Sequence, residues 1–226
     1  MGADPGVDTN LQGQKLGRKG RITRQRILTA ARELIEDPET EDFSISAVAR
    51  RAELRVSSIY NYFPDLPDLF LTVLEPIIAE TQVEHLAILE RFWPDDTLGE
   101  DCRAFVQAFH SFWKRNVRLL HMRNAMADKH EQRVLSQRIL SARQVVNLLG
   151  QQMGGPKEGY EGPEYDLASV LYTGLERVVT IATDELLKAH YPPHVQRRFG
   201  GATLVQQGRL LELAIRDERA RIATEG

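Results

Sequence analysis

The chain has 226 residues, of which 42% are hydrophobic and 27% are charged, and its formal net charge is −3 at pH 7. These values are ordinary for a folded protein of one or two domains, and they argue against a disordered chain or a membrane protein. No apolar run reaches the roughly 18 residues that cross a bilayer. The N-terminus has no basic start followed by an apolar core, so we do not expect it to be a signal peptide. Cys102 is the single cysteine, which excludes an intrachain disulfide. We expect a cytoplasmic protein with no membrane partner.

The N-terminal segment combines a polar tail with a basic stretch. Residues 1–17 are rich in Gly, Asp, Asn and Gln without periodicity, which predicts a disordered tail. Between residues 9 and 32 there are seven basic residues and no acidic one. Such a stretch in an acidic protein indicates either a surface that meets phosphate or a solvated tail. From Thr23 onward, apolar residues recur at three- and four-residue steps and predict a first helix that ends before Pro38.

Two short helices are predicted next. Ser44 is a suitable N-cap for a helix over residues 46–52, and a break at 53–55 separates it from a third helix over 56–62. Two short helices across a tight turn form a helix-turn-helix pattern. Pro64 ends the third helix, and Asp65 is expected to cap a long fourth helix over 66–91.

The third helix, VSSIYNYF over residues 56–63, places its side chains in an ordered way around the axis. At about 100° per residue, Ile59 and Phe63 share one side and Asn61 lies opposite them. Tyr60 and Tyr62 each fall roughly 80° from the centre of the buried side. Asn61 and its serine neighbours could therefore meet base edges while the tyrosine hydroxyls meet phosphates. The same pattern also fits a surface helix whose two aromatic side chains only pack.

The rest of the chain is predicted to be helical, over residues 97–118, 119–127, 129–152, 163–189 and 200–223. No alternating run argues for a strand, so the fold class is all-α. We expect a disordered tail at 1–17, a helix-turn-helix domain at 18–66, and a helical bundle at 67–226.

Signs of catalysis are weak. The glycine-rich segment 150–159 lacks the Gly-Lys-Ser/Thr ending of a phosphate loop, and the six histidines form no HExxH motif. Cys102 has no metal partners at suitable spacing. We expect no enzyme activity, no cofactor and no metal.

Three segments together carry a family resemblance: ITRQRILTAARELI (22–35), FSISAVARRAELRVSSIYNYF (43–63) and PDLPDLF (64–70). They closely resemble the DNA-binding domain of TetR-family transcriptional regulators over about residues 21–71. The resemblance implies a homodimer that places each third helix in the major groove of one half of a near-palindromic operator. The DNA-contacting positions it implies are Ser46, Arg55, Val56, Ser57, Ser58, Tyr60, Asn61 and Tyr62.

Three positions depart from the family pattern. Glu53 stands where members commonly carry Gly, Arg55 where Ser is frequent, and Leu66 where many have Lys. A phosphate contact is thus expected to be missing at the start of the fourth helix. We hypothesise that a basic arm compensates by reaching the DNA backbone or minor groove, through Arg18, Lys19, Arg21 and Arg24.

The resemblance further implies an effector pocket and a dimer face in the C-terminal bundle. An aromatic stripe at helical spacing could line an apolar pocket or form ordinary core, and the pocket candidates are Phe105, Phe109, Phe112, Trp113, Met122, Met126, Leu171, Tyr172 and Leu175. Dimer candidates on the last two long helices, which monomer core could also explain, are Val170, Gly174, Val178, Ile181, Leu204, Gly208, Leu211 and Ile215.

The function expected from this resemblance is a ligand-responsive repressor that releases a palindromic operator when a small, lipophilic molecule binds the C-terminal domain. The alternative is a helical small-molecule-binding protein without DNA activity.

Overall fold

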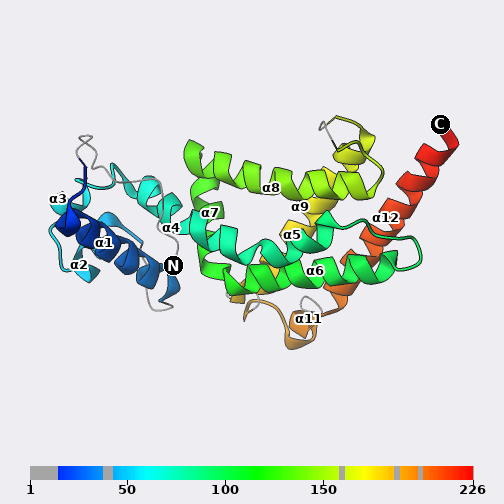
Figure 1. Cartoon of the computed structure of the whole chain (residues 1–226). Helices are drawn as coiled ribbons and strands as arrows, with labels where there is room; N and C mark the ends of the chain where they lie inside the picture. The colour runs from blue at the N-terminus through cyan, green and yellow to red at the C-terminus, as the bar shows by residue number, and fades with distance from the viewer. Residues whose placement is uncertain (1–14, 38–42, 158–160, 186–188, 198–200, 226) are drawn as a thin grey trace. The chain divides into compact units, whose positions relative to one another are not determined.

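The computed structural model describes residues 15–37, 43–157, 161–185, 189–197 and 201–225, so most of the predicted tail lies outside the described residues. These residues form helices and connecting segments and contain no β-strand, which confirms the all-α class (Figure 1). The contacts separate two compact units, Met1–Ala79 and Glu80–Gly226. The boundary expected at 66/67 stays a prediction, since a compact unit and a functional domain need not coincide. None of the described helices is both long and apolar enough to span a bilayer.

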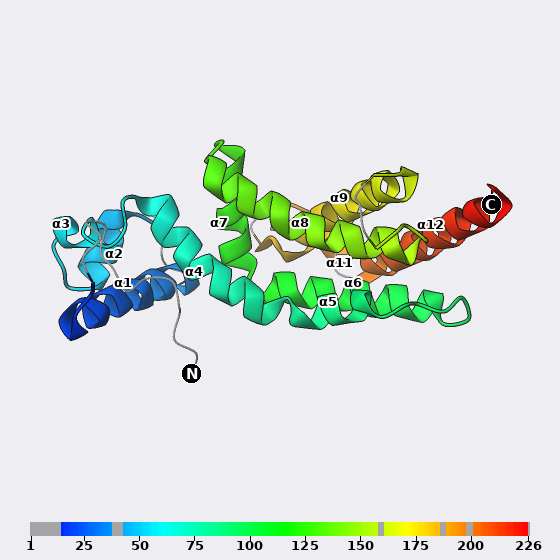
Figure 2. The same ribbon diagram turned by 45° about the horizontal axis from the view of Figure 1, so that its top comes forward.

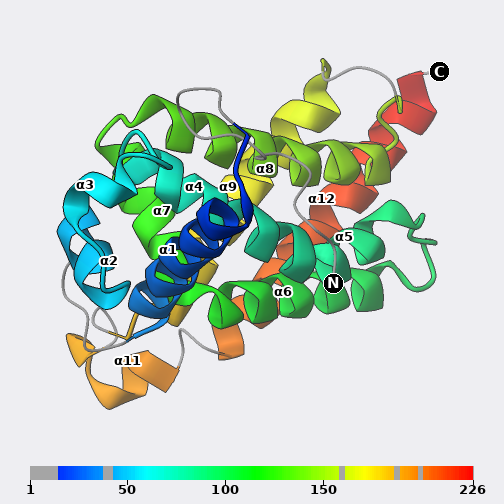
Figure 3. The ribbon, with the colours of Figure 1, turned by 60° about the vertical axis from the view of Figure 1, so that its left-hand side comes forward.

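The described residues of the first unit form three helices and most of a fourth (Figure 3). Helix α1 spans Arg18–Glu36, α2 Ile45–Arg51, α3 Val56–Ile59 and α4 Leu66–Thr81. Helix α2 packs on both α1 and α3. The buried side chains that hold the unit together include Ile27, Leu34, Val48, Ile59 and Phe70.

Helix α1 begins five residues before the predicted start at Thr23. The basic residues Arg18 to Arg24 therefore form its first two turns instead of an extended arm. Leu16 explains the earlier start: it is 7% exposed and packs against Gly20, where an added Cβ would lie 2.9 Å from Leu16 Cδ2. Arg and Lys are also good helix formers, so this stretch joins the helix once its base is anchored.

The fourth helix starts as predicted but ends early. Asp65 caps it, because Asp65 Oδ1 accepts a hydrogen bond from the Asp68 amide at 2.9 Å. Helix α4 then ends at Thr81, and α5 begins anew at Val83, so the continuous helix over 66–91 is wrong. Pro76 lies inside α4 and removes one helical hydrogen bond. The break itself falls where Asn116 Nδ2 donates to Thr81 Oγ1 at 3.1 Å, a tertiary contact that no local pattern predicts.

The second unit is a bundle centred on α9, which packs against α6, α7, α8 and α12 (Figures 1 and 2). Its helices are α5 Val83–Glu90, α6 Leu98–Arg115, α7 Val117–Asp128, α8 Gln132–Gln152, α9 Pro163–Thr183, α11 Pro193–Arg197 and α12 Thr203–Glu225. Helices α8 and α9 run close together near Gly150, where an added Cβ would come within 2.5 Å of the Tyr165 ring. Helix α9 is shorter than the predicted 163–189.

Candidate nucleic-acid interface and ligand groove

The turn between α2 and α3 is a helix C-cap of the Schellman type. Ser44 begins α2 as predicted, since its Oγ accepts a hydrogen bond from the Ala47 amide at 3.2 Å. At the other end, the Leu54 amide donates to the Ala49 carbonyl at 2.9 Å and the Glu53 amide donates to the Arg50 carbonyl at 3.2 Å. This motif requires a left-handed residue, and Glu53 supplies it with φ of 52°. A residue with a β-carbon thus occupies a position that favours glycine.

Replacing Glu53 with glycine should therefore stabilise the protein. We expect the free energy of unfolding to rise by about 1 kcal/mol, because a β-carbon in the left-handed region costs roughly that much. Chemical denaturation of the full chain measures the gain. Glu53→Ala is the matched control: it removes the same charge from the helix C-terminus but keeps the β-carbon. Equal stability of the glycine and alanine variants would contradict a strained backbone at this residue.

Helix α3 is shorter than predicted, yet its side chains are exposed or buried as the helical wheel predicts. It ends at Ile59, and a turn completes the segment, in which the Tyr62 and Phe63 amides both donate to the Ile59 carbonyl at 2.9 and 3.0 Å. Pro64 keeps Phe63 out of the helical region, since a residue before proline avoids it. Ile59 and Phe63 are 0% and 1% exposed.

The side chains predicted to read DNA lie on the opposite side of this segment. Ser57 and Asn61 are exposed, Tyr60 is 48% exposed, and Ser58 and Tyr62 are half-buried. Val56 is exposed beside them and could contact a thymine methyl group. Their roles stay predictions.

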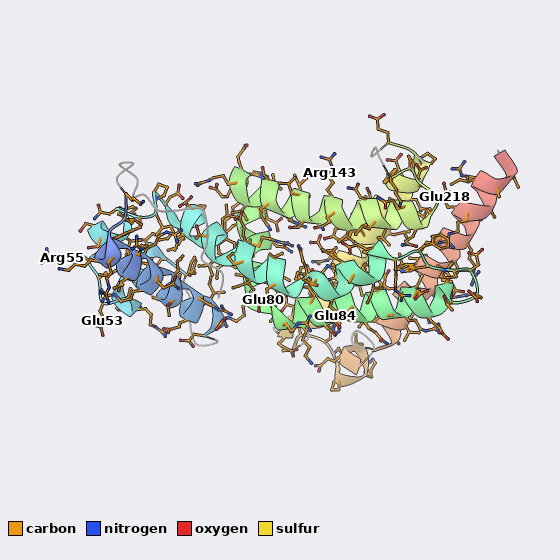
Figure 4. The ribbon with its side chains drawn as sticks, viewed as in Figure 1. Glu53, Arg55, Glu80, Glu84, Arg143 and Glu218 are labelled. Atoms are coloured by element: carbon orange, nitrogen blue, oxygen red, sulfur yellow. The ribbon has the colours of Figure 1, made fainter. Side chains whose placement is uncertain are left out.

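Arg55 and Ser46 flank this surface. Arg55 occupies the N-cap position of α3 with no capping side-chain hydrogen bond, and it points out from the unit (Figure 4). Ser46 is exposed in the first turn of α2. Arg55 thus presents a guanidinium at a position where serine is frequent in TetR-family regulators. A guanidinium can form hydrogen bonds with a phosphate or a guanine.

The four basic residues assigned to the N-terminal stretch have different surroundings. Arg18, Lys19 and Arg21 are exposed at the start of α1, and Arg21 Nη1 donates to the Leu16 carbonyl at 2.8 Å. Arg24 instead lies over the Phe63 ring, with its guanidinium carbon 5.3 Å from the ring centroid. Arg24 therefore packs under the recognition segment. The first turn of α1 has no acidic residue, so its positive dipole end and its basic side chains can both attract phosphate.

The residues predicted for an effector pocket lie mainly in the core of the second unit. Phe105, Phe109, Phe112 and Trp113 are at most 6% exposed, and neighbouring phenylalanine rings lie about 6 Å apart, at 5.9 and 6.1 Å. Leu171 and Leu175 are buried, while Met122 and Met126 are half-buried. Tyr172 joins this core to a groove: it contacts Phe109 at 5.9 Å between ring centroids and also lines a cavity between α8 and α9.

That groove has two adjoining parts. The first, of about 490 Å³, is lined by Leu135, Arg138, Ile139, Ala142, Arg143, Val146, Asn147, Tyr165, Asp166, Ser169, Tyr172, Thr173 and Glu176. The second, of about 450 Å³, lies among α7, α8 and α9 and shares Arg138, Thr173 and Glu176 with the first. Apart from Tyr172, the sequence did not single these residues out. The sequence feature that could have pointed to the groove is Glu176, a charged residue beside the core positions of α9.

The dimer candidates divide into two groups. Val170 is 69% exposed, Gly174 is exposed, and Val178 and Ile181 are half-buried, so one side of α9 presents apolar surface. On α12, Gly208, Leu211 and Ile215 are buried, and Leu204 is half-buried. Helix α12 packs on α6, where an added Cβ on Gly208 would lie 3.2 Å from Arg103 Cγ. This stripe of α12 therefore serves the core of one subunit.

No group of three or more His, Cys, Asp and Glu side chains among the described residues could hold a metal ion. Cys102 is buried, and burial, followed by the charges of Glu212 and Asp101, raises the pKa of its thiol to about 12.

Comparison with known proteins agrees with this geometry. Residues 27–73 match the family model of bacterial regulatory proteins of the tetR family. A TetR-like transcriptional regulator from Rhodococcus sp. RHA1 has a similar structure, with a TM-score of 0.53 and 18% identity over 89% of this chain and 96% of that protein. A candidate TetR-family regulator from Mesorhizobium loti MAFF303099 gives a TM-score of 0.51 and 17% identity over 88% of this chain and 97% of the other.

No curated protein sequence matches the chain. At these identities, the solved structures show the fold alone. The family match covers a segment that contains α2, α3 and the start of α4. The N-terminal segment therefore matches the tetR family of bacterial regulatory proteins, and most of the chain shares the fold of a TetR-like transcriptional regulator.

Proposed function

We propose that this regulator is a ligand-responsive repressor that binds a near-palindromic operator as a homodimer. The observation that carries the proposal is the recognition segment. Its buried side is fixed by Ile59 and Phe63, and its free side presents Ser57, Tyr60 and Asn61. Small polar groups on a helix of this kind can enter a major groove, where Asn pairs bidentately with adenine. The basic start of α1 adds positive charge in the same unit.

The apolar surface on α9 supports the dimer. Gly174 is nearest to Gln207 of α12, with 4.0 Å between an added Cβ and Gln207 Nε2, so the two helices adjoin there. Leu210, about one turn from Gln207, is 48% exposed, and Val170 on α9 is 69% exposed. Apolar side chains this exposed on adjoining helices fit an interface between two copies of the chain. In this dimer, an effector in the C-terminal domain would favour an arrangement whose recognition helices no longer match two half-sites.

Selection from random DNA duplexes, followed by fluorescence anisotropy, tests the proposal. We expect an enriched, near-palindromic sequence whose half-sites lie one helical turn apart, roughly 34–36 Å, or a multiple of it. Two chains should bind each duplex. Failure to enrich any sequence would overturn the proposal and favour a helical small-molecule-binding protein without DNA activity.

Two substitutions then test how the recognition segment is used. Asn61→Ala should relax preference at one base pair of each half-site by roughly 5- to 150-fold, equivalent to about 1–3 kcal/mol. Tyr60→Phe removes a hydroxyl expected to bind phosphate, so it should weaken all duplexes equally, by about 1 kcal/mol. The two variants control for each other, because an exchange of their phenotypes would show that the sides of the helix are wrongly assigned.

A further inference from the structure

Helix α9 presents three different sides to its surroundings. Leu175 and Val179 face the core, Val170 and Gly174 carry the exposed apolar surface, and Glu176 and Thr173 border the groove toward α8. At about 100° per residue, these three sides are separated by roughly 110–140° around the helix. Any molecule held in the groove therefore contacts the same helix that carries the proposed dimer face.

The floor of the groove is an ion cluster. Glu176 accepts from Arg123 Nη2 at 3.2 Å through one carboxylate oxygen and from Arg138 Nη2 at 3.3 Å through the other. Arg123 is 4% exposed and lines neither part of the groove, whereas Arg138 lines both. Around the larger part, Arg138 and Arg143 stand against Asp166 and Glu176, so the charges of its lining balance. An anion can therefore bind where it replaces a carboxylate partner of one of these arginines.

Arg138 is held loosely and can take another partner. Its Nη1 lies 3.3 Å from Asp128 Oδ1, and its contact with Glu176 is equally long. Charge-assisted hydrogen bonds of this kind are usually about 2.7–2.9 Å long. Asp128 is 73% exposed, so it returns to water at little cost if another anion replaces it.

Tyr172 supplies a second donor near Arg138. Its side chain lines the groove and is 8% exposed. Burial, followed by the charge of Glu176, raises the pKa of Tyr172, so its hydroxyl stays protonated and can donate a hydrogen bond. The wall on the α8 side is apolar, formed by Leu135, Ile139, Ala142 and Val146.

We propose that this groove binds a small amphipathic carboxylate, with its anionic head on Arg138 and Tyr172 and its apolar body along Ile139 and Val146. The volume of about 490 Å³ lies in the range of small-molecule sites. This inference rests on the proposed function, because it assigns the chemical class of the effector.

Three ten-carbon probes test the head group by isothermal titration calorimetry: decanoate, decanol and decyltrimethylammonium. Each is used below the concentration at which it aggregates or separates from water. Decanoate should bind full-length protein at least about 10-fold more tightly than decanol, and the cation more weakly still. Arg138→Gln should remove the preference for decanoate and leave the affinity for decanol unchanged. Tightest binding by the cation would overturn the assignment.

Two neighbouring residues on α8 test the location. Ile139 and Leu140 are 55% and 64% exposed, but only Ile139 borders the groove described here. Ile139→Ser should weaken decanoate binding several-fold, whereas Leu140→Ser should not. Equal losses would indicate adsorption to an apolar surface and sink the proposal. DNA selection is independent of this test: an enriched operator without decanoate binding removes this inference alone, and decanoate binding without an operator removes the repressor proposal alone.

Discussion

Replacing Glu176 with glutamine is expected to lower the free energy of unfolding by about 3–5 kcal/mol. Glu176 is the carboxylate bound to Arg123, whose side chain is 4% exposed. The glutamine amide oxygen can still accept a hydrogen bond, but it carries no counter-charge for Arg123. The other hydrogen-bond acceptor described for this guanidinium is the neutral Asn124 Oδ1, at 3.3 and 3.1 Å, and Trp113 lies 6.0 Å away. A buried charge without its counter-charge is costly because water no longer solvates it.

Urea denaturation of the full chain measures this loss, and two further variants identify its cause. Asp128→Asn removes a carboxylate from the same cluster, but Asp128 is 73% exposed, so the loss should stay below about 1 kcal/mol. The double variant Arg123→Met with Glu176→Met removes both buried charges and should be more stable than Glu176→Gln alone. A Glu176→Gln variant as stable as Asp128→Asn would show that the pair is solvated in solution.

Acidification from pH 7 to pH 4 is expected to cost about 3 kcal/mol of stability through His85 alone. His85 is 2% exposed and its ring lies against Phe109 and Phe112, with centroids at 5.3 and 4.8 Å. No described residue forms a hydrogen bond with its Nδ1. Burial, followed by the charge of Arg115, lowers the pKa of His85 from 6.5 to about 4.

The sign follows from where the proton binds. Between pH 6.5 and pH 4 the unfolded chain binds a proton at His85 and the folded chain does not, so protonation favours unfolding. Stability is therefore complete above pH 6.5 and falls as the pH drops toward 4. Denaturation at a series of pH values should show a shallower fall for His85→Phe than for the natural chain. NMR titration of the imidazole checks the cause directly, and a His85 pKa near 6.5 would refute it.

Local chemistry was enough to predict the helix-turn-helix. Ser44 and Asp65 cap helices because their side-chain oxygens meet amides three residues ahead, and the structure has both hydrogen bonds. Ile59 and Phe63 are buried and Asn61 is exposed, as the helical period requires, even though α3 ends at Ile59. These features depend on residues within one or two turns of each other, so the sequence alone determines them.

Other features depend on contacts between distant segments. Leu16 packs against Gly20, so the basic stretch forms the first turns of α1. Asn116 donates a hydrogen bond to Thr81 where α4 ends. The spacing of the apolar stripe of α12 fits a dimer face as well as it fits the core of one subunit. Packing against α6 buries Leu211 and Ile215 within one subunit. A helical period shows which side of a helix is apolar and does not show which neighbour covers it.

The sequence by itself determined the all-α class, the family resemblance and the side of the recognition segment that faces solvent, because each follows from local spacing and propensity. Only the tertiary structure decided where the ligand groove lies. Its ion cluster joins Arg123 to Glu176, 53 residues apart, across α7 and α9, and its apolar wall comes from α8. Side chains so far apart along the chain meet only when three helices pack, and sequence periodicity carries no information about that packing.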